Sequence, residues 1–367
     1  MLLSLALGLA LVQQQGFRTD TTIAVPPGAR LDLELASGGV TIRTWDRNQV
    51  RIRASHSART TLDIRHDAGL LRIEAEGRMG MPGDVELELS VPADAAVDIE
   101  GLTVDVEAEA MRGLLRVETM DGDIRVRDAA DLRLETMNGM ITVAGARGRI
   151  NLGTVSRDIV AAGLSGEVTA ESVSGGIWLT GTESSAVAAE TISGDVVFQG
   201  AVRAGGSYTL ASHSGNLTFG LPAGAGATVS TALAAGRLSA SFTLPGGETR
   251  SRRRQLLQFG DGSATVELES FSGNIRLVRP DEVPARTATP GRDRRPGASH
   301  LEEALEDGLG GLLEALEELG LPGHGLPGLD REIRREVKDA LKLERRWRSA
   351  GDAAEWLPPA SIHSTEN

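Results

Sequence analysis

The chain has 367 residues and a formal net charge of −13, with aromatic residues at only 3% and glycine at 45 positions. This length suffices for one large domain plus a tail. The acidic balance argues against a nucleic-acid partner, because binding to phosphates needs a basic surface. The absence of cysteine excludes disulfides, thiol catalysis and cysteine-ligated metal sites, and we expect no lipid-anchored start of the bacterial lipoprotein type.

An apolar run at residues 2–12 has the character of a signal-peptide core. It is too short to span a bilayer, and no basic residue precedes it. A buried N-terminal segment is the alternative. We predict a signal peptide over residues 1–16 and therefore an exported protein that is periplasmic, at the cell surface or secreted.

Residues 17–100 alternate apolar and polar side chains in short runs, for example at 31–35, 50–53 and 85–89. This period of two is typical of strands with one buried face. No regular repeat is visible in this part of the chain. We predict an N-terminal β region that forms a one-sided sheet or caps the repeats that follow.

Residues 101–280 contain a repeated unit with a period near 18. Each unit starts with a hydroxyl residue, usually continues with an apolar residue and an Asp/Asn/Ser–Gly turn, and ends in a short alternating strand. We expect these turns to use positive φ, and Arg157 in place of the glycine to change or strain one of them. Residues 270–277 restore the motif as a final unit. The units start at Thr119, Thr136, Thr154, Ser172, Thr191 and Ser212.

A single unit is too small to fold alone. Its roughly six apolar side chains contribute on the order of 10–15 kcal/mol when buried, whereas ordering its backbone costs roughly 18–36 kcal/mol. The units must therefore stack. We predict an all-β fold, a single-chain β-solenoid of stacked ~18-residue repeats with a C-terminal helical tail. A hairpin array is the alternative.

Stacking places equivalent residues in columns, and we predict that two columns are buried. The first holds the first strand residue after each turn: Ile124, Ile141, Ile159, Ile177 and Val196. The second holds the residue after each hydroxyl: Met120, Met137, Val155, Val173 and Ile192, with His213 as its cap.

The C-terminal part has a different composition. Residues 281–300 are rich in Pro, Arg and Gly and indicate a linker. Residues 301–348 carry a leucine stripe with an acidic face and then a basic stretch, which predicts two helices that pair as a hairpin. Alternatively, the helices bind other partners, with the basic helix contacting an anionic membrane or a protein. Residues 349–367 are predicted to be a disordered tail.

Several segments resemble the bacterial putative-adhesin family, a β-strand-repeat domain of unknown function. They are the leader at 25–28 (VPPG), the turn and strand at 37–42 (SGGVTI), the segment at 89–92 (LSVP) and the repeated T-x-[DNS]-G-x-[IV] units. The resemblance covers about residues 21–280. It implies adhesion and an envelope location, and it carries no catalytic or binding residues.

No constellation of residues predicts catalysis. The six histidines are scattered, and neither a nucleophile elbow nor a phosphate-binding loop is present. Asp123, Asp158 and Asp195 follow the turns, but the nine-residue period of calcium-binding β-rolls is missing. We therefore expect no catalytic residue, no cofactor and no metal site.

One acidic column could bind a ligand. Glutamates precede the hydroxyl residue in four units, and stacking brings such like charges close together. A carboxylate stripe that binds Ca²⁺ or a basic ligand is one interpretation. We favour solvated glutamates paired with arginines, as is usual on strand surfaces. The column consists of Glu118, Glu135, Glu171 and Glu190.

Taken together, these features predict a non-enzymatic, adhesin-like structural or binding protein of the cell envelope, with an unknown protein or polysaccharide ligand. One alternative is a solenoid carbohydrate-active enzyme, for which Asp121 and Asp123 with Arg125 and Arg127 are the best candidates. The other is an envelope-stress regulatory component whose helical tail contacts a membrane or a partner.

Overall fold

The computed structural model describes residues 17–67, 69–77, 83–245, 254–284 and 286. These residues belong to one compact unit. They are all-β, as predicted, with 22 strands, no α-helix and a single 3₁₀ turn, η1 (Pro280–Glu282). None of them forms a helix long and apolar enough to cross a bilayer. The predicted signal peptide at 1–16 and the helices and tail at 301–367 lie outside the described residues.

The N-terminal strands combine antiparallel and parallel pairs. β1 (Phe17–Ala24) pairs antiparallel with β3 (Gln49–His56), which pairs antiparallel with β6 (Val85–Pro92). β4 (Thr60–Asp67) pairs antiparallel with β5 (Leu70–Gly77). The long β2 (Arg30–Trp45) pairs in parallel with β5, β6 and β7 (Ala96–Glu109), so regular parallel stacking already begins in this region.

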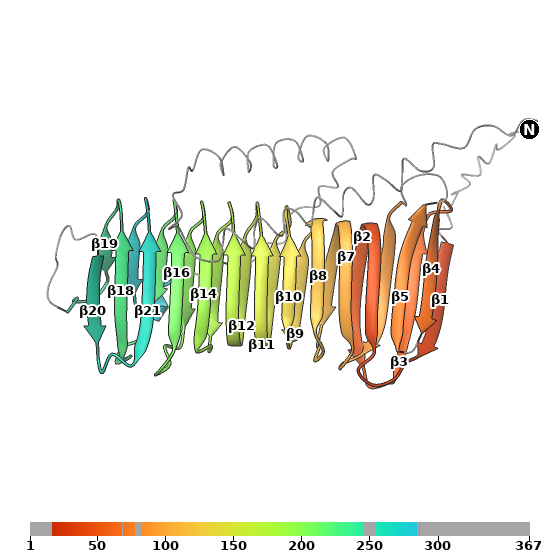
Figure 1. Cartoon of the computed structure of the whole chain (residues 1–367), viewed down its shortest axis with the longest axis horizontal. Coiled ribbons are helices and arrows are strands. Elements are labelled where there is room, and N and C mark those ends of the chain that lie inside the picture. Colours follow the sequence, from red (N-terminus) through yellow and green to blue (C-terminus); the bar gives the residue numbers. More distant parts are fainter. Residues whose placement is uncertain (1–16, 68, 78–82, 246–253, 285, 287–367) are drawn as a thin grey trace, which may run out of the picture. The chain divides into compact units, whose positions relative to one another are not determined.

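From β7 to β17, each repeat unit contributes strand residues to each of two parallel faces, and the strands lie side by side along one row (Figure 1). β7, β11 (Ile141–Thr154) and β12 (Ile159–Ser172) each continue from one face to the other. The buried side chains of both faces form one hydrophobic core. The other strands of the first face are β8 (Leu115–Asp121), β10 (Leu132–Thr136), β14 (Ala186–Thr191) and β16 (Ser207–Ser212). Those of the second face are β9 (Ile124–Ala129), β13 (Ile177–Thr182), β15 (Val196–Gly200) and β17 (Leu217–Gly220).

The unit at residues 270–277 is not the end of the stack, so that prediction is wrong. After β17 the chain forms β18 (Ala227–Leu233), β19 (Leu238–Ala240) and β20 (Arg254–Phe259) before β21 (Ala264–Ser270) and β22 (Ile275–Val278). β21 pairs in parallel with both β16 and β18, and β22 with both β17 and β19. The last unit of the sequence is therefore inserted between earlier ones, and the antiparallel pair β18–β20 forms the end.

The first predicted column is confirmed. Its five residues are opposite one another in consecutive parallel pairs, and each is 0% exposed. The column continues through Leu217 to Ile275, which are also fully buried. Next to it, the rings of Phe198 and Phe219 stack with centroids 5.0 Å apart, and Tyr208 packs against both.

The second predicted column points outward, which corrects the prediction. Strand β8 buries Leu115, Val117 and Thr119, so the alternation of side chains turns the next residue to the outer side. Met120 itself is buried, at 8% exposed, but its equivalents in later units are only partly buried, and no member of the column belongs to the core cluster. His213 therefore does not cap a core column. Its ring stacks on Phe271 at a centroid distance of 4.7 Å.

The buried residue of this corner is the hydroxyl that starts each unit. Ser212 Oγ accepts a hydrogen bond from the Gly215 N–H at 2.7 Å and donates one to the Gly194 carbonyl at 2.9 Å. The same pair of bonds recurs in other units, with Thr191 and Ser270 as the hydroxyl residues. Each hydroxyl thus satisfies its own turn and joins it to the preceding unit, as a buried polar group requires.

Glycine is required in these turns because of close backbone approach, not because of positive φ. A Cβ atom on Gly215 would lie 1.7 Å from the Gly194 carbonyl oxygen, and one on Gly194 would lie 1.9 Å from that of Gly175. Among the turn glycines of the units that start at Thr119 to Ser212, only Gly122 has φ in the left-handed region, at +141°. Arg157 lies outside that region, and its carbonyl faces Gly175 in the same way. The strain expected at Arg157 is therefore not seen in its φ.

We predict that Ile177→Asp lowers the free energy of unfolding by several kcal/mol, because it places an unpaired charge in the core. Chemical denaturation measures the effect. Ala162→Asp on the exposed side of β12 is the control and should change stability by less than about 0.5 kcal/mol. Equal effects of the two substitutions would contradict the assignment of faces.

Gly215→Ala should cost about 1–3 kcal/mol, because the added methyl group overlaps a backbone carbonyl that cannot move freely. The matched control is Gly153→Ala, whose Cβ would meet only the Glu135 Cγ at an ordinary 3.6 Å. Thermal unfolding of both variants tests the comparison. A Gly215 variant as stable as the Gly153 variant would show that close approach does not determine the turn.

Candidate functional site

The most extended polar feature on the outer side is a row of glutamates that we call the glutamate row. Its members face one another across the parallel pairs, with interruptions at Gly153 and Ala211. Within the predicted acidic column, Glu118 lies opposite Glu135 and Glu171 lies opposite Glu190. The row consists of Glu74, Glu34, Glu100, Glu118, Glu135, Glu171, Glu190 and Glu269.

The sequence predicted only half of this row. Glu269 precedes Ser270 and could have been found by the same offset from the hydroxyl residue. Glu34 and Glu100 precede Leu35 and Gly101, so the repeat motif contains no signal for them. Only the pairing of β2 with β7 brings them into register.

Arginines pair with several glutamates of the row. Arg116 pairs with Glu118, Arg133 Nε lies 2.5 Å from Glu135 Oε1, and Arg72 Nε lies 3.7 Å from Glu74 Oε1. These arginines belong to the outer positions two residues away along the same strands. In later units the position two residues before the row is occupied by Thr169, Ala188, Thr209 and Glu267. There, Arg254 of β20 lies 3.6 Å from the Glu269 carboxylate.

Burial and mutual repulsion act on the carboxyl groups of the row. Burial raises the pKa of Glu190 above its ordinary value, and the charge of Glu269 adds to the rise. Burial also raises the pKa of Glu100, assisted by Glu118. For Glu135, burial raises the pKa even though Arg133 opposes it. A nearby cation would therefore find partly desolvated carboxylates here.

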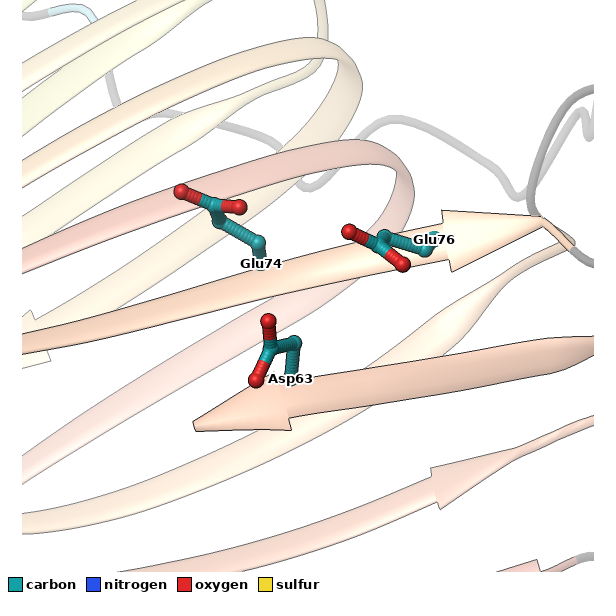
Figure 2. Close-up of side chains that lie close together, drawn as sticks. All are labelled: Asp63, Glu74 and Glu76. Atoms are coloured by element: carbon teal, nitrogen blue, oxygen red, sulfur yellow. The ribbon is translucent and has the colours of Figure 1, made fainter. Parts of the chain in front are cut away.

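An acidic cluster lies at the N-terminal end of the row. Figure 2 shows Asp63 on β4 and Glu74 and Glu76 on β5, and one oxygen of each lies within 4.8 Å of the others. Oxygen ligands at this separation suit a hard cation such as Ca²⁺. However, Asp63 already pairs with Arg65, and Glu74 pairs with Arg72. The cluster is thus a set of partly neutralised surface carboxylates.

The aspartates after the turns bind backbone. Asp123 Oδ1 accepts the Met140 N–H at 2.9 Å, Asp158 Oδ1 the Gly176 N–H at 2.8 Å, and Asp195 Oδ1 the Asn216 N–H at 2.8 Å. Each acceptor and donor belong to adjacent units. These carboxylates therefore join successive units, a role that the sequence did not suggest.

Asp121, Asp123 and Arg125 are candidates for a carbohydrate-active site, and Asp123 already makes the backbone contact described above. Asp123 also pairs with Arg125 at 2.7 Å. Burial raises the pKa of Asp121, with Asp105 adding to the rise and Arg157 opposing it. The outward side chain of Asp123 thus binds both Arg125 and the backbone N–H of Met140.

A groove of about 560 Å³ lies on the second face, near the C-terminal end of the described residues. The segment after β22 lies along it. Pro284 lines the groove, and the Arg286 guanidinium lies 4.0 Å above the centre of the Trp178 ring and pairs with Asp158. The groove is lined by Trp178, Asp195, Asn216, Arg237, Arg276 and Pro284, among others.

A line of outward side chains runs along the corner next to the glutamate row, and we call it the corner stripe. Backbone hydrogen bonds between adjacent units hold its members in register, for example from His213 N–H to the Thr191 carbonyl at 3.2 Å. Phe271 is 58% exposed, Met120 is buried at 8%, and the others are partly buried. The stripe consists of Met120, Met137, Val155, Val173, Ile192, His213 and Phe271.

These features define the chain as an all-β, repeat-built domain with long outer rows of like side chains. The family described as Toastrack DUF4097 matches residues 29–278, which is more than half of the chain. The chain therefore belongs to this family of unknown function, and the resemblance inferred from residues 21–280 is confirmed.

Among solved structures, the crystal structure of a putative cell adhesion protein from Clostridium sporogenes ATCC 15579 is similar to this chain. The two share 11% identity, the match covers 72% of this chain and 100% of the other, and the TM-score is 0.18. At this TM-score the likeness supports no conclusion about activity. No curated protein matches the chain.

We predict that Glu190→Gln makes the protein more stable at pH 7, by less than about 1 kcal/mol. A carboxyl whose pKa is higher in the folded than in the unfolded state loses stability as pH rises from its unfolded pKa through its folded pKa. The neutral amide avoids this loss. Urea denaturation of both proteins at neutral pH and below pH 4 should show an advantage only at neutral pH. A destabilised variant at pH 7 would mean that Glu190 has a favourable charged partner.

Proposed function

We propose that the protein is an exported, non-enzymatic β-solenoid of the cell envelope that acts as a structural or adhesin-like binding module. The parallel, in-register pairing of successive units supports the solenoid. In this proposal the helical tail at 301–348 is a separate element. Membership in a family of unknown function is compatible with this role and does not define it.

The proposal rests on the observation that the polar side chains at the corner between the two faces are engaged in hydrogen bonds within the fold. Their hydroxyl, carboxylate and amide groups bind the backbone of neighbouring units, as with Ser212, Asp158 and Asp195. Groups committed in this way are unavailable to abstract or donate protons to a substrate. The remaining outer side chains form long rows, which suit contact with an extended partner better than catalysis on a small molecule.

Cell fractionation tests the location. The full chain with a C-terminal epitope, produced in its native host, should appear in the envelope, periplasm or medium without its first residues. A variant that lacks residues 2–12 should remain in the cytoplasm. Full-length protein retained in the cytoplasm would contradict export.

Incubation with purified envelope polysaccharide tests the absence of catalysis. The protein should sediment with the polysaccharide, or leave it unbound if its ligand is a protein, and it should release no reducing ends. Release of reducing ends that is lost in Asp121→Asn would favour the carbohydrate-active enzyme instead.

A further inference from the structure

The corner stripe runs over seven adjacent units; Met120 is buried at 8% exposed, and from Met137 to Phe271 the side chains are in partial contact with water. At about 4.8 Å per unit, it extends roughly 29 Å. A contiguous row of partly exposed apolar side chains bordered by charged residues is a candidate site of contact with another protein. The stripe ends in the stacked rings of His213 and Phe271, of which Phe271 is 58% exposed.

The turn itself does not require apolar side chains at these positions. The backbone makes the stacking contacts: the Ile192 N–H donates to the Ser172 carbonyl, and the Ile192 carbonyl accepts from the Ser214 N–H. A serine or asparagine could make the same backbone bonds. The fold therefore does not account for the repeated choice of methionine, valine and isoleucine.

The glutamate row lies beside the stripe on the same outer side. Each glutamate precedes its stripe residue by two positions, as Glu118 precedes Met120 and Glu190 precedes Ile192. Alternation along a strand places such residues on one side. Arginines pair with Glu118, Glu135 and Glu269, whereas the position two residues before Glu190 is occupied by Ala188. The row therefore presents carboxylates of which only some have an arginine on the neighbouring outer positions.

We propose that the corner stripe and the glutamate row together form a docking surface for an amphipathic helix with basic residues beside its apolar face. The proposal rests on the binding role proposed above and specifies its partner. The helix turns repeat every 5.4 Å, close to the spacing of the units, and about 20 residues would cover the stripe. The carboxylates would repel an anionic membrane surface, so a protein segment is the partner that the charge favours.

The test uses the full chain and a labelled 20-residue synthetic helix with a leucine face flanked by lysines, followed by fluorescence anisotropy. We expect saturable binding that weakens at high salt. The double variant Val173→Thr/Ile192→Thr should weaken binding at least tenfold. Glu171→Gln/Glu190→Gln should also weaken it and reduce its dependence on salt. Leu114→Thr, at an exposed leucine outside the stripe, should bind as the parent does.

A peptide with glutamates in place of the lysines should not bind. The inference is overturned if the two peptides bind equally, if neither double variant weakens binding, or if the basic peptide fails to bind at about 1 mM. Thermal unfolding confirms that the variants remain folded, and the two glutamines leave the stripe itself intact. Fractionation of the cells is independent of this result, so failure of the docking surface is distinguishable from failure of the proposed envelope role.

Discussion

Contact between successive turns at one corner is the constraint on which the rest of the structure depends. The missing side chain of Gly215 admits the carbonyl of the preceding turn, and the buried hydroxyl of Ser212 bonds to both turns. These contacts hold neighbouring units in parallel register. Any residue type that recurs at one position therefore becomes a continuous row. The hydrophobic column at Ile177, the glutamate row and the corner stripe all follow from this register.

Sequence reasoning succeeded where alternation and position within the unit decide the outcome. The column containing Ile177 was correct because its offset from the turn sets both its face and its register. The column containing Val173 lies outside the core because alternation along the strand, and not hydrophobicity, decides which side chain turns inward; it buries the hydroxyl of Ser172 instead. The spacing of the repeat units also carries no information on the order in which they stack. The side-chain pattern of β21 would fit next to any strand of the first face, and only the structure shows that β21 lies between β16 and β18.

The candidate site could be predicted only in part, for related reasons. Glu118 and Glu190 share a motif, whereas Glu34 joins the row through a pairing between strands distant in sequence. The carboxylate of Asp158 resembles a ligand in the sequence, but its acceptor role depends on a backbone N–H 18 positions away. Such bonds depend on the spacing of the folded units. A chemical interpretation of isolated polar residues therefore overestimates the groups available to a ligand.

The insertion of β21 and β22 between earlier units affects the order in which the structure can be completed. During synthesis from the N-terminus, β16 to β19 are made before β21 and β22. Until then, β16 and β17 have open parallel edges, and β18 and β19 lack their parallel neighbours. Residues 264–278 close both gaps at once. The units therefore cannot all stack in the order of synthesis, because β21 and β22 must pair between strands that are already made. The long sequence separation between β21 and β16 also slows this pairing. A chain shortened before residue 264 would lose an internal joint and leave two aggregation-prone edges in the middle of the array.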